Sequence, residues 1–568
     1  MDLERKTHNA PRTAPLIDTI RTSVIGRDTA VLTPFGLRRV TYADYTASGR
    51  SLDFIEDFIR NTVLPLYANT HTETSGTGLQ TTRFREDARA IIRNAVGGNE
   101  EHAVIFAGSG STGAIDRLIT ILGFRIPAGL DDRFGLTALI PAEDRPVVFV
   151  GPYEHHSNEL PWRESIADVV EIAEDPDGHI DMVDLERRLI EFSARRLRIG
   201  SFSAASNVTG IITDTSAVSS LLHRHGALSF WDFAAAAPYV GIEMRSNRGD
   251  NLDYKDAIFI SPHKFIGGPG TPGVLVARKD ILHNRVPSIP GGGTVTYVNS
   301  SVHHYLVDPE HREEGGTPAI VESIRAGLVF QLKERVGVSE IRAREEDYIG
   351  RAIAAWSQNP NLMILGNPKA ARLSIVSFVV RFGERFLHHN YVVALLNDLF
   401  GIQARGGCSC AGPYGHRLLG IDAGTSDLIE VQVGRGCEVI KPGWVRVNFN
   451  YFIDEDEFTY IVEAVNLIAE HGWRLLPLYR FESDTALWRH RLGLPRPPLT
   501  LFDIDYTSGA LTHPVERLQD PDHTFASYLA DAHRLFATSA AIADTVEDIL
   551  EKDAEALRWF PLPNEVMA

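Results

Sequence analysis

The sequence has little cysteine, no excess of positive charge and no long apolar run. Its three cysteines, Cys408, Cys410 and Cys437, are too few among 568 residues for a disulfide framework and are typical of a reducing compartment. The formal net charge of -18 argues against nucleic-acid binding. No stretch reaches the roughly 18 apolar residues of a membrane span, and residues 1–18 lack the apolar core of a signal peptide. We therefore expect a soluble, cytoplasmic protein that binds neither nucleic acid nor membrane.

Short apolar runs alternate with helical periodicity over the first 300 residues. The runs that predict strands are 103–107, 146–150, 198–203, 228–232, 256–260 and 273–278. Helices are expected over 84–97, from Ala114 onward, over 183–194 and over 215–225. This alternation predicts an α/β fold with a mostly parallel sheet covered by helices.

Polar side chains follow the ends of most of these strands. They are Ser111, Thr112, His155, Asn207, Asp232 and Lys264. Ligands of open parallel sheets bind beyond the carboxyl ends of the strands, so these residues are expected to share one site. Each has a simpler alternative as a helix cap, a turn residue or a core histidine. One shared site explains all of them together.

Lys264 lies between two apolar runs, in Ser261-Pro262-His263-Lys264, and is followed by a glycine- and proline-rich turn. Burial at a strand end lowers the pKa of an amine, which an imine-forming lysine requires. A second glycine-rich turn, 108–113, joins a strand to a helix start, where free N–H groups favour an anion. It lacks the lysine spacing of a P-loop.

A smaller region follows, with helices expected over 318–336, 339–357, 390–400 and 455–470 and strands over 374–381 and 445–449. Within it, glycines flank Cys408 and Cys410 in the segment 405–416, which indicates an exposed loop. Arg405 and His416 are candidates for lowering a thiol pKa there. No second cysteine pair completes a zinc site, and a disulfide between residues two apart would be strained. A chance pair of cysteines in a loop is the alternative.

The pattern from about Tyr42 to Ala469 resembles the class V aminotransferase family of pyridoxal-phosphate enzymes, and most closely its cysteine desulfurase and selenocysteine lyase branch. The Ser-Pro-His-Lys-Phe run with its glycines carries the resemblance most specifically. The resemblance implies a fold-type-I architecture with a seven-stranded-type sheet, a smaller α+β domain and a homodimer. The expected divisions are a lead-in over 1–40, the large domain 41–300, the small domain 301–476 and a partly helical extension 477–568.

By this resemblance, Lys264 would form the imine with pyridoxal 5'-phosphate, and Asp232 would hold the pyridine nitrogen protonated. His155 would stack on the ring and Asn207 would contact its phenolic oxygen. The resemblance gives the phosphate ligands as Ser111, Thr112, Ser261, His263 and, from the neighbouring subunit, Thr294. Arg446 would bind the substrate carboxylate, and Cys410 would accept sulfur.

The chain departs from the family pattern at Ala235, where glutamine is usual, and at Cys408 and Ser409, where histidines are usual. The leading function is a cysteine desulfurase-like lyase acting on L-cysteine, with a sulfur-acceptor protein as a possible partner. The alternatives are another class V aminotransferase, epimerase or lyase, in which the cysteine loop is not catalytic, and a non-catalytic binding protein. No metal is expected.

Overall fold

The computed structural model describes residues 14–70, 72–246, 249–493, 499–514, 518–520, 523–538 and 550–566. The chain divides into two compact units, which we describe separately. The first comprises the described residues up to Ile25, Tyr45–Glu346 and Lys369–Leu373, and the second comprises Gly26–Asp44, Asp347–Pro368 and the described residues from Ser374. Residues 301–346 therefore group with the first unit, and the described part of the extension groups with the second. The proline-rich segment 494–498 and residues 539–549 of the expected helical end lie outside the described residues.

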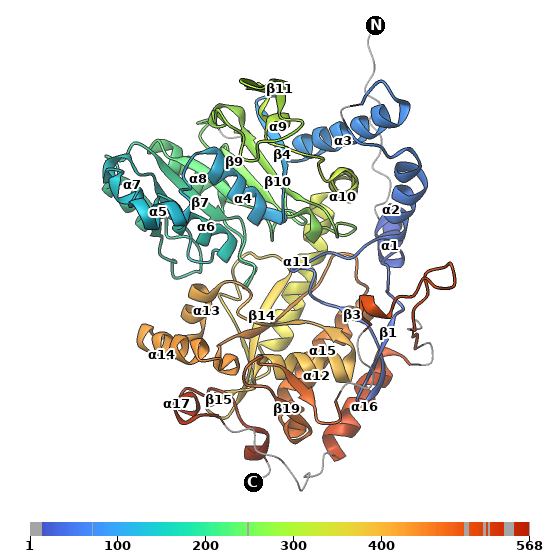
Figure 1. Cartoon of the computed structure of the whole chain (residues 1–568). Coiled ribbons are helices and arrows are strands. Elements are labelled where there is room, and N and C mark those ends of the chain that lie inside the picture. The colour runs from blue at the N-terminus through green and yellow to red at the C-terminus, as the bar shows by residue number, and fades with distance from the viewer. Residues whose placement is uncertain are drawn as a thin grey trace. The chain divides into compact units, whose positions relative to one another are not determined.

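A seven-stranded sheet forms the centre of the first unit (Figure 1). Its strands, in spatial order, are β4 (His102–Ala107), β10 (Gly273–Arg278), β9 (Ala257–Ile260), β8 (Leu228–Asp232), β7 (Arg198–Ser203), β5 (Val147–Val150) and β6 (Asp168–Glu171). Only β10 runs antiparallel to its neighbours, β4 and β9. The predicted mostly parallel sheet is confirmed. Strand β4 is buried along its whole length, in keeping with the continuous apolar run over residues 103–107.

The helices of the first unit begin and end near their expected positions, with one difference. The sheet is packed by α4 (Gly110–Ile121) and α8 (Thr215–Arg224), and α7 spans Met182–Glu191. Helix α3 runs from Gly76 to Ala95, eight residues earlier than its predicted start at residue 84. The Ser75 side chain caps it by accepting a hydrogen bond from Gly78 N. The first turns contain few apolar residues, so periodicity alone did not mark them.

Buried carboxylates cover the open edge of the sheet at β4. Glu310, in the short helix α9 (Pro309–Arg312), accepts a hydrogen bond from Val104 N at 2.6 Å. Glu314 accepts one from Phe106 N at 2.7 Å. Arg93 and Arg89 of α3 pair with these two carboxylates. An edge strand whose N–H groups are bonded in this way is protected from pairing with another chain.

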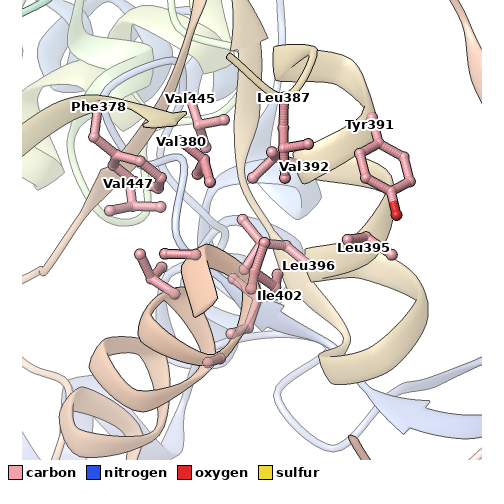
Figure 2. Packing of buried hydrophobic residues seen from close by; sticks show 14 of the residues in the cluster. Phe378, Val380, Leu387, Tyr391, Val392, Leu395, Leu396, Ile402, Val445 and Val447 are labelled. Atoms are coloured by element: carbon pink, nitrogen blue, oxygen red, sulfur yellow. The ribbon is translucent and has the colours of Figure 1, made fainter. Parts of the chain in front are cut away.

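The second unit is built on an antiparallel sheet packed by helices. The strands, in spatial order, are β13 (Leu362–Ile364), β14 (Ile375–Phe382), β18 (Trp444–Asn448) and β17 (Arg405–Gly407). Figure 2 shows side chains of β14 and β18, among them Phe378 and Val447, packed near Leu395 and Leu396 of α12 (His389–Phe400). Helix α15 (Glu455–His471) belongs to the same core.

The described part of the extension contributes to this core. The short strands β19 (Tyr479–Phe481) and β20 (Trp488–His490) form a hairpin. In α16 (Phe525–Thr538), Tyr528 and Phe536 are buried, and Phe525 stacks on Tyr460 with ring centroids 4.2 Å apart. The short helix α17 spans Lys552–Glu555, and Phe560 after it is also buried.

The remaining elements include two long helices with buried residues and several shorter helices and strands. They are α1 (Ala14–Thr22), β1 (Ala30–Thr33), β2 (Gly36–Arg39), β3 (Thr41–Tyr42), α2 (Asp53–Phe58), α5 (Ala128–Phe134), α6 (Leu160–Arg163), β11 (Val295–Val298), β12 (His303–Tyr305), α10 (Ile320–Val336), α11 (Val338–Trp356), β15 (Arg385–Phe386), β16 (Ile402–Gln403), α13 (Gly412–Leu419) and α14 (Ala423–Gly434). Within the described residues, no helix combines the length and the apolar character that a membrane crossing requires.

Candidate active site

The predicted site residues of the first unit lie after the carboxyl ends of its parallel strands. Asp232 is the last residue of β8, and Ser261 directly follows β9, its parallel neighbour. Lys264 ends a one-turn 3-10 helix, Pro262–Lys264, that begins there. His155 and Asn207 lie in the turns that follow β5 and β7. The topology therefore brings this set to one edge of the sheet, as the sequence predicts.

The turn before α4 makes a close cradle with Ser261 and His263. The backbone N–H of Ser111 donates to Ser261 Oγ at 2.8 Å, and the two hydroxyl oxygens are 3.1 Å apart. Gly110 has a φ of 56°, and a side chain there would place its Cβ 2.8 Å from Ser261 Oγ and 3.5 Å from His263 Nε2. The bare glycine leaves this space open at the N-terminus of a 12-residue helix. This donor set fits a phosphate group.

A cavity of about 570 Å³ adjoins this cradle. Its lining includes Gly108, Gly110, His263 and Thr271. Burial lowers the pKa of His263 to about 4, and the neighbouring charge of Lys264 acts in the same direction. At neutral pH the imidazole is therefore uncharged and adds no positive charge to this cradle.

Asp232 is a buried carboxyl in a polar surrounding. Burial raises its pKa, whereas the hydrogen bond from Ala234 N, at 2.8 Å, the charge of Lys264 and a hydrogen bond from Ser111 lower it. A carboxylate at such a position is stabilised by a cationic N–H partner. A protonated pyridine nitrogen is a partner of this kind, so the residue fits its predicted role.

A chain of hydrogen bonds links His155 to the phosphate cradle. His155 Nδ1 lies 3.0 Å from Ser157 Oγ, which lies 2.6 Å from Thr112 Oγ1 in α4. Asn207, 7% exposed, follows β7. Ser157 was missed from the sequence because a serine in a turn has no distinguishing pattern, and only the folded turn places it between two predicted ligands.

Thr294 is fully buried within its own chain. Its hydroxyl donates to Gly291 O at 2.6 Å, just before the hairpin of β11 and β12. Tyr297 and Val298 of this hairpin are more than half exposed. The contact of Thr294 with a neighbouring subunit's phosphate stays a prediction.

Arg446 and the cysteine loop lie in the second unit. Arg446 Nη2 in β18 contacts Asp44 Oδ1 at 2.8 Å. Burial lowers the pKa of Arg446, and the charge of Asp44 opposes that shift. The guanidinium is thus held in a buried ion pair, and a substrate carboxylate would have to share it with Asp44.

The cysteine loop follows β17 and precedes α13. Cys408 is exposed, whereas Cys410 is only partly exposed. Ser409 and Cys410 have φ values of 50° and 56°, in the left-handed region that non-glycine residues rarely adopt. Burial lowers the pKa of His416, so this imidazole is a weaker source of positive charge for the thiols than expected. The identity of the reacting thiol stays a prediction.

The chain belongs to the aminotransferase class-V family, whose sequence profile matches residues 41–424. It is therefore a pyridoxal-phosphate-dependent enzyme. The predicted family is confirmed.

The chain is similar to several individual proteins that are named cysteine desulfurases or probable cysteine desulfurases. A probable cysteine desulfurase of Halalkalibacterium halodurans is 27% identical over 387 residues, which cover 66% of this chain and 84% of the relative. A probable cysteine desulfurase of Halobacterium salinarum is 25% identical over 75% of this chain and 91% of its own length. The solved structure of a cysteine desulfurase from Thermococcus onnurineus has a TM-score of 0.62 at 22% identity, covering 83% of this chain and all of that chain. The structural likeness confirms the fold.

Proposed function

We propose that this protein is a cysteine desulfurase-like lyase that removes sulfur from L-cysteine and releases alanine. The arrangement of Lys264 and Asp232 beyond neighbouring parallel strands carries the proposal that pyridoxal phosphate binds here. The Cys408–Cys410 loop supports sulfur chemistry, and relatives named probable cysteine desulfurases support the substrate class.

Several side chains of the first unit would hold the cofactor. The cradle of Ser111, Ser261 and His263 would bind its phosphate, with Thr112 held in place through Ser157. Asp232 would bind the pyridine N–H, His155 would cover the ring face, and Lys264 would carry the covalent link. When bound, the cofactor supplies an electron sink for cleavage at the substrate Cα.

The chain's own groups would then move protons and sulfur. The Lys264 amine would remove the Cα proton of the substrate. A thiolate of Cys410 would attack the substrate sulfur, so that an S–S bond forms as the Cβ–S bond breaks. Protonation of the substrate Cβ, and return of a proton from Lys264 to Cα, would give alanine and leave a persulfide on Cys410. Arg446 would orient the substrate carboxylate in competition with Asp44.

The test is product release from a panel of amino acids by the reconstituted protein. Alanine formed from L-cysteine, with a matching amount of sulfane sulfur on the protein, is the expected result. The Cys410→Ser variant is expected to lose sulfur transfer, and the Cys408→Ser variant serves as the matched control with most activity retained. Alanine formation at the normal rate by the Cys410→Ser variant would indicate a lyase without a cysteine acceptor. If no cysteine is consumed, the protein is another class V enzyme.

A further inference from the structure

Glu154 is a buried carboxyl that joins the turn carrying His155 to the end of β7. Its Oε1 accepts hydrogen bonds from Gly151 N at 3.2 Å and from Ser203 N at 2.9 Å. Its Oε2 accepts from Asn158 Nδ2 at 2.7 Å and from Ser203 Oγ at 2.6 Å. The side chain is 4% exposed. Both oxygens are thus used, and the residue bonds to two separate strand-end segments.

All four hydrogen-bond partners of Glu154 donate to it, which suits a carboxyl with two acceptor oxygens. Ser201 Oγ donates to Asn158 Oδ1 at 2.7 Å and so fixes the orientation of the Asn158 amide. The NH2 group of Asn158 therefore faces Glu154. Gly151 and Ser203 present backbone N–H groups, which can only donate. A side chain at residue 151 would place its Cβ 2.6 Å from Glu154 Oε1, so a larger residue there would displace the Glu154 carboxyl. Burial raises the pKa of Glu154 to about 7, and the bonds from Ser203 and Asn158 act against that shift.

Glu154 and its hydrogen-bond partners, which we call the Glu154 clamp, are linked to two of the proposed cofactor residues. His155 is the next residue in the chain, and Ser203 pairs in register with Asp232 across β7 and β8. We propose that Glu154 is a positioning residue, which fixes the His155 turn against the strand end beside Asp232 and so sets how the cofactor ring is held. This inference rests on the proposed cofactor site and goes beyond it, because Glu154 itself is not proposed to touch the cofactor.

The Glu154→Gln variant tests the clamp, because it keeps the size of the side chain but replaces one acceptor oxygen with an NH2 group. The new NH2 group would face hydrogen-bond donors in place of one acceptor oxygen. The amide of Asn158 cannot rotate to offer its oxygen instead, because that oxygen accepts from Ser201 Oγ. The variant leaves a buried donor without an acceptor, and such a loss corresponds to about a tenfold effect or more. We therefore expect the Kd for pyridoxal phosphate to rise at least tenfold and the visible circular dichroism of bound cofactor to change.

Two further variants make the result specific. Glu159→Gln is the matched control, since Glu159 is 6% exposed and lies on the same segment but pairs with Arg163. It should leave the Kd and the dichroism within about twofold of the parent. Ser203→Ala removes one donor to Glu154 and should move both readouts in the same direction as Glu154→Gln, by less. It serves if Glu154→Gln does not fold.

The outcomes separate this inference from the cofactor proposal. If the parent chain forms no lysine-linked chromophore with pyridoxal phosphate, the cofactor proposal itself is wrong. If the parent does form it, but Glu154→Gln and Ser203→Ala match Glu159→Gln in Kd and dichroism, the positioning role is overturned. A lowered melting temperature of the cofactor-free variants with unchanged dichroism would show a purely structural role and would also overturn it.

Discussion

At Asp232, burial and hydrogen bonding act in opposite directions on one carboxyl. Burial raises its pKa, and Ala234 N, Lys264 and Ser111 favour the charged form. The net effect raises the pKa of Asp232, and a cation placed beside the carboxyl would favour its charged form. The neighbouring His263 is kept neutral by burial, with a pKa lowered to about 4. His263 therefore adds no positive charge to this part of the site at neutral pH.

Replacing Asp232 with alanine should lower turnover far more than it lowers stability. Removal of one preorganised electrostatic group from an active site costs about a hundredfold in rate or more, and we expect a loss of this size. Turnover and cofactor affinity, measured on the same preparation, check the prediction. Asp132→Ala, at an exposed position in α5, is the control and should leave both unchanged. Near-parent turnover in Asp232→Ala would show that the residue does not contact the cofactor.

The sequence indicated which candidate residues lie near strand ends, but not how their side chains are connected. Most predicted residues of the first unit lie at or just after the end of a buried strand, and that pattern is visible locally at positions such as Asp232 and Lys264. Glu154 contacts Ser203, which is 49 positions away in the chain, and Ser157 contacts Thr112, which is 45 positions away. Such contacts depend on which strands are neighbours, which no local pattern contains.

Among the elements, the strands were the most predictable and their directions the least. The ranges 198–203, 228–232 and 273–278 match β7, β8 and β10 residue for residue, and each of these strands is buried at all but one of its residues. The reversed direction of β10 is set by its pairing with β4 and β9 and leaves no mark on its own sequence. The exposed hairpin of β11 and β12 was missed because it lacks a buried face.

In the second unit, two buried histidines at the start of α12 pack on aromatic residues near the end of the chain. The rings of His388 and His389 stack on Trp559 with centroid distances of 5.1 and 5.7 Å. Burial lowers the pKa of His389 to about 3 and that of His388 well below its ordinary value, with the charge of His389 adding to the second shift. Both rings are neutral in the folded state at neutral pH.

This pair should make the second unit sensitive to acid. A histidine whose pKa is lower in the folded state than in the unfolded state binds protons preferentially on unfolding, so its contribution to stability is complete above about pH 6.5 and declines as the pH falls toward 3. Thermal unfolding from pH 7.5 to 4.5 should show this loss, and His389→Phe should reduce it. His533→Gln, at an exposed position of α16, should retain the parent's pH dependence. Equal profiles for the parent and His389→Phe would contradict the prediction.

On the scale of the whole molecule, several side chains in the described part of the extension beyond residue 476 belong to the core of the second unit. Tyr479, Tyr528, Phe536 and Phe560 are all at most 3% exposed. Tyr479 also donates its hydroxyl hydrogen to Asp398 at 2.7 Å. Burying one large apolar side chain stabilises a fold by roughly 1.5–3 kcal/mol, so the group as a whole outweighs any single surface contact.

Deleting residues 477–568 should therefore unfold or aggregate the second unit. The truncated chain is expected to be largely insoluble, or to bind a hydrophobic dye strongly and lose its cooperative melting. Phe502→Ser is the control, because Phe502 lies in the extension but is 99% exposed, and it should leave solubility and melting unchanged. A soluble truncated chain with the parent's melting transition would show that the extension is dispensable for folding.

The most direct test of the whole account is borohydride trapping of the purified protein incubated with pyridoxal phosphate. Reduction should remove the visible absorption of the bound cofactor and leave one added pyridoxyl group, found by peptide mass spectrometry on Lys264. The Lys264→Ala variant should show neither the reducible absorption nor the modified peptide, although it keeps the phosphate cradle of Ser111 and Ser261. A parent protein that traps no cofactor, or that traps it only on another lysine, would contradict the central claim that Lys264 at the strand-end site is the catalytic amine.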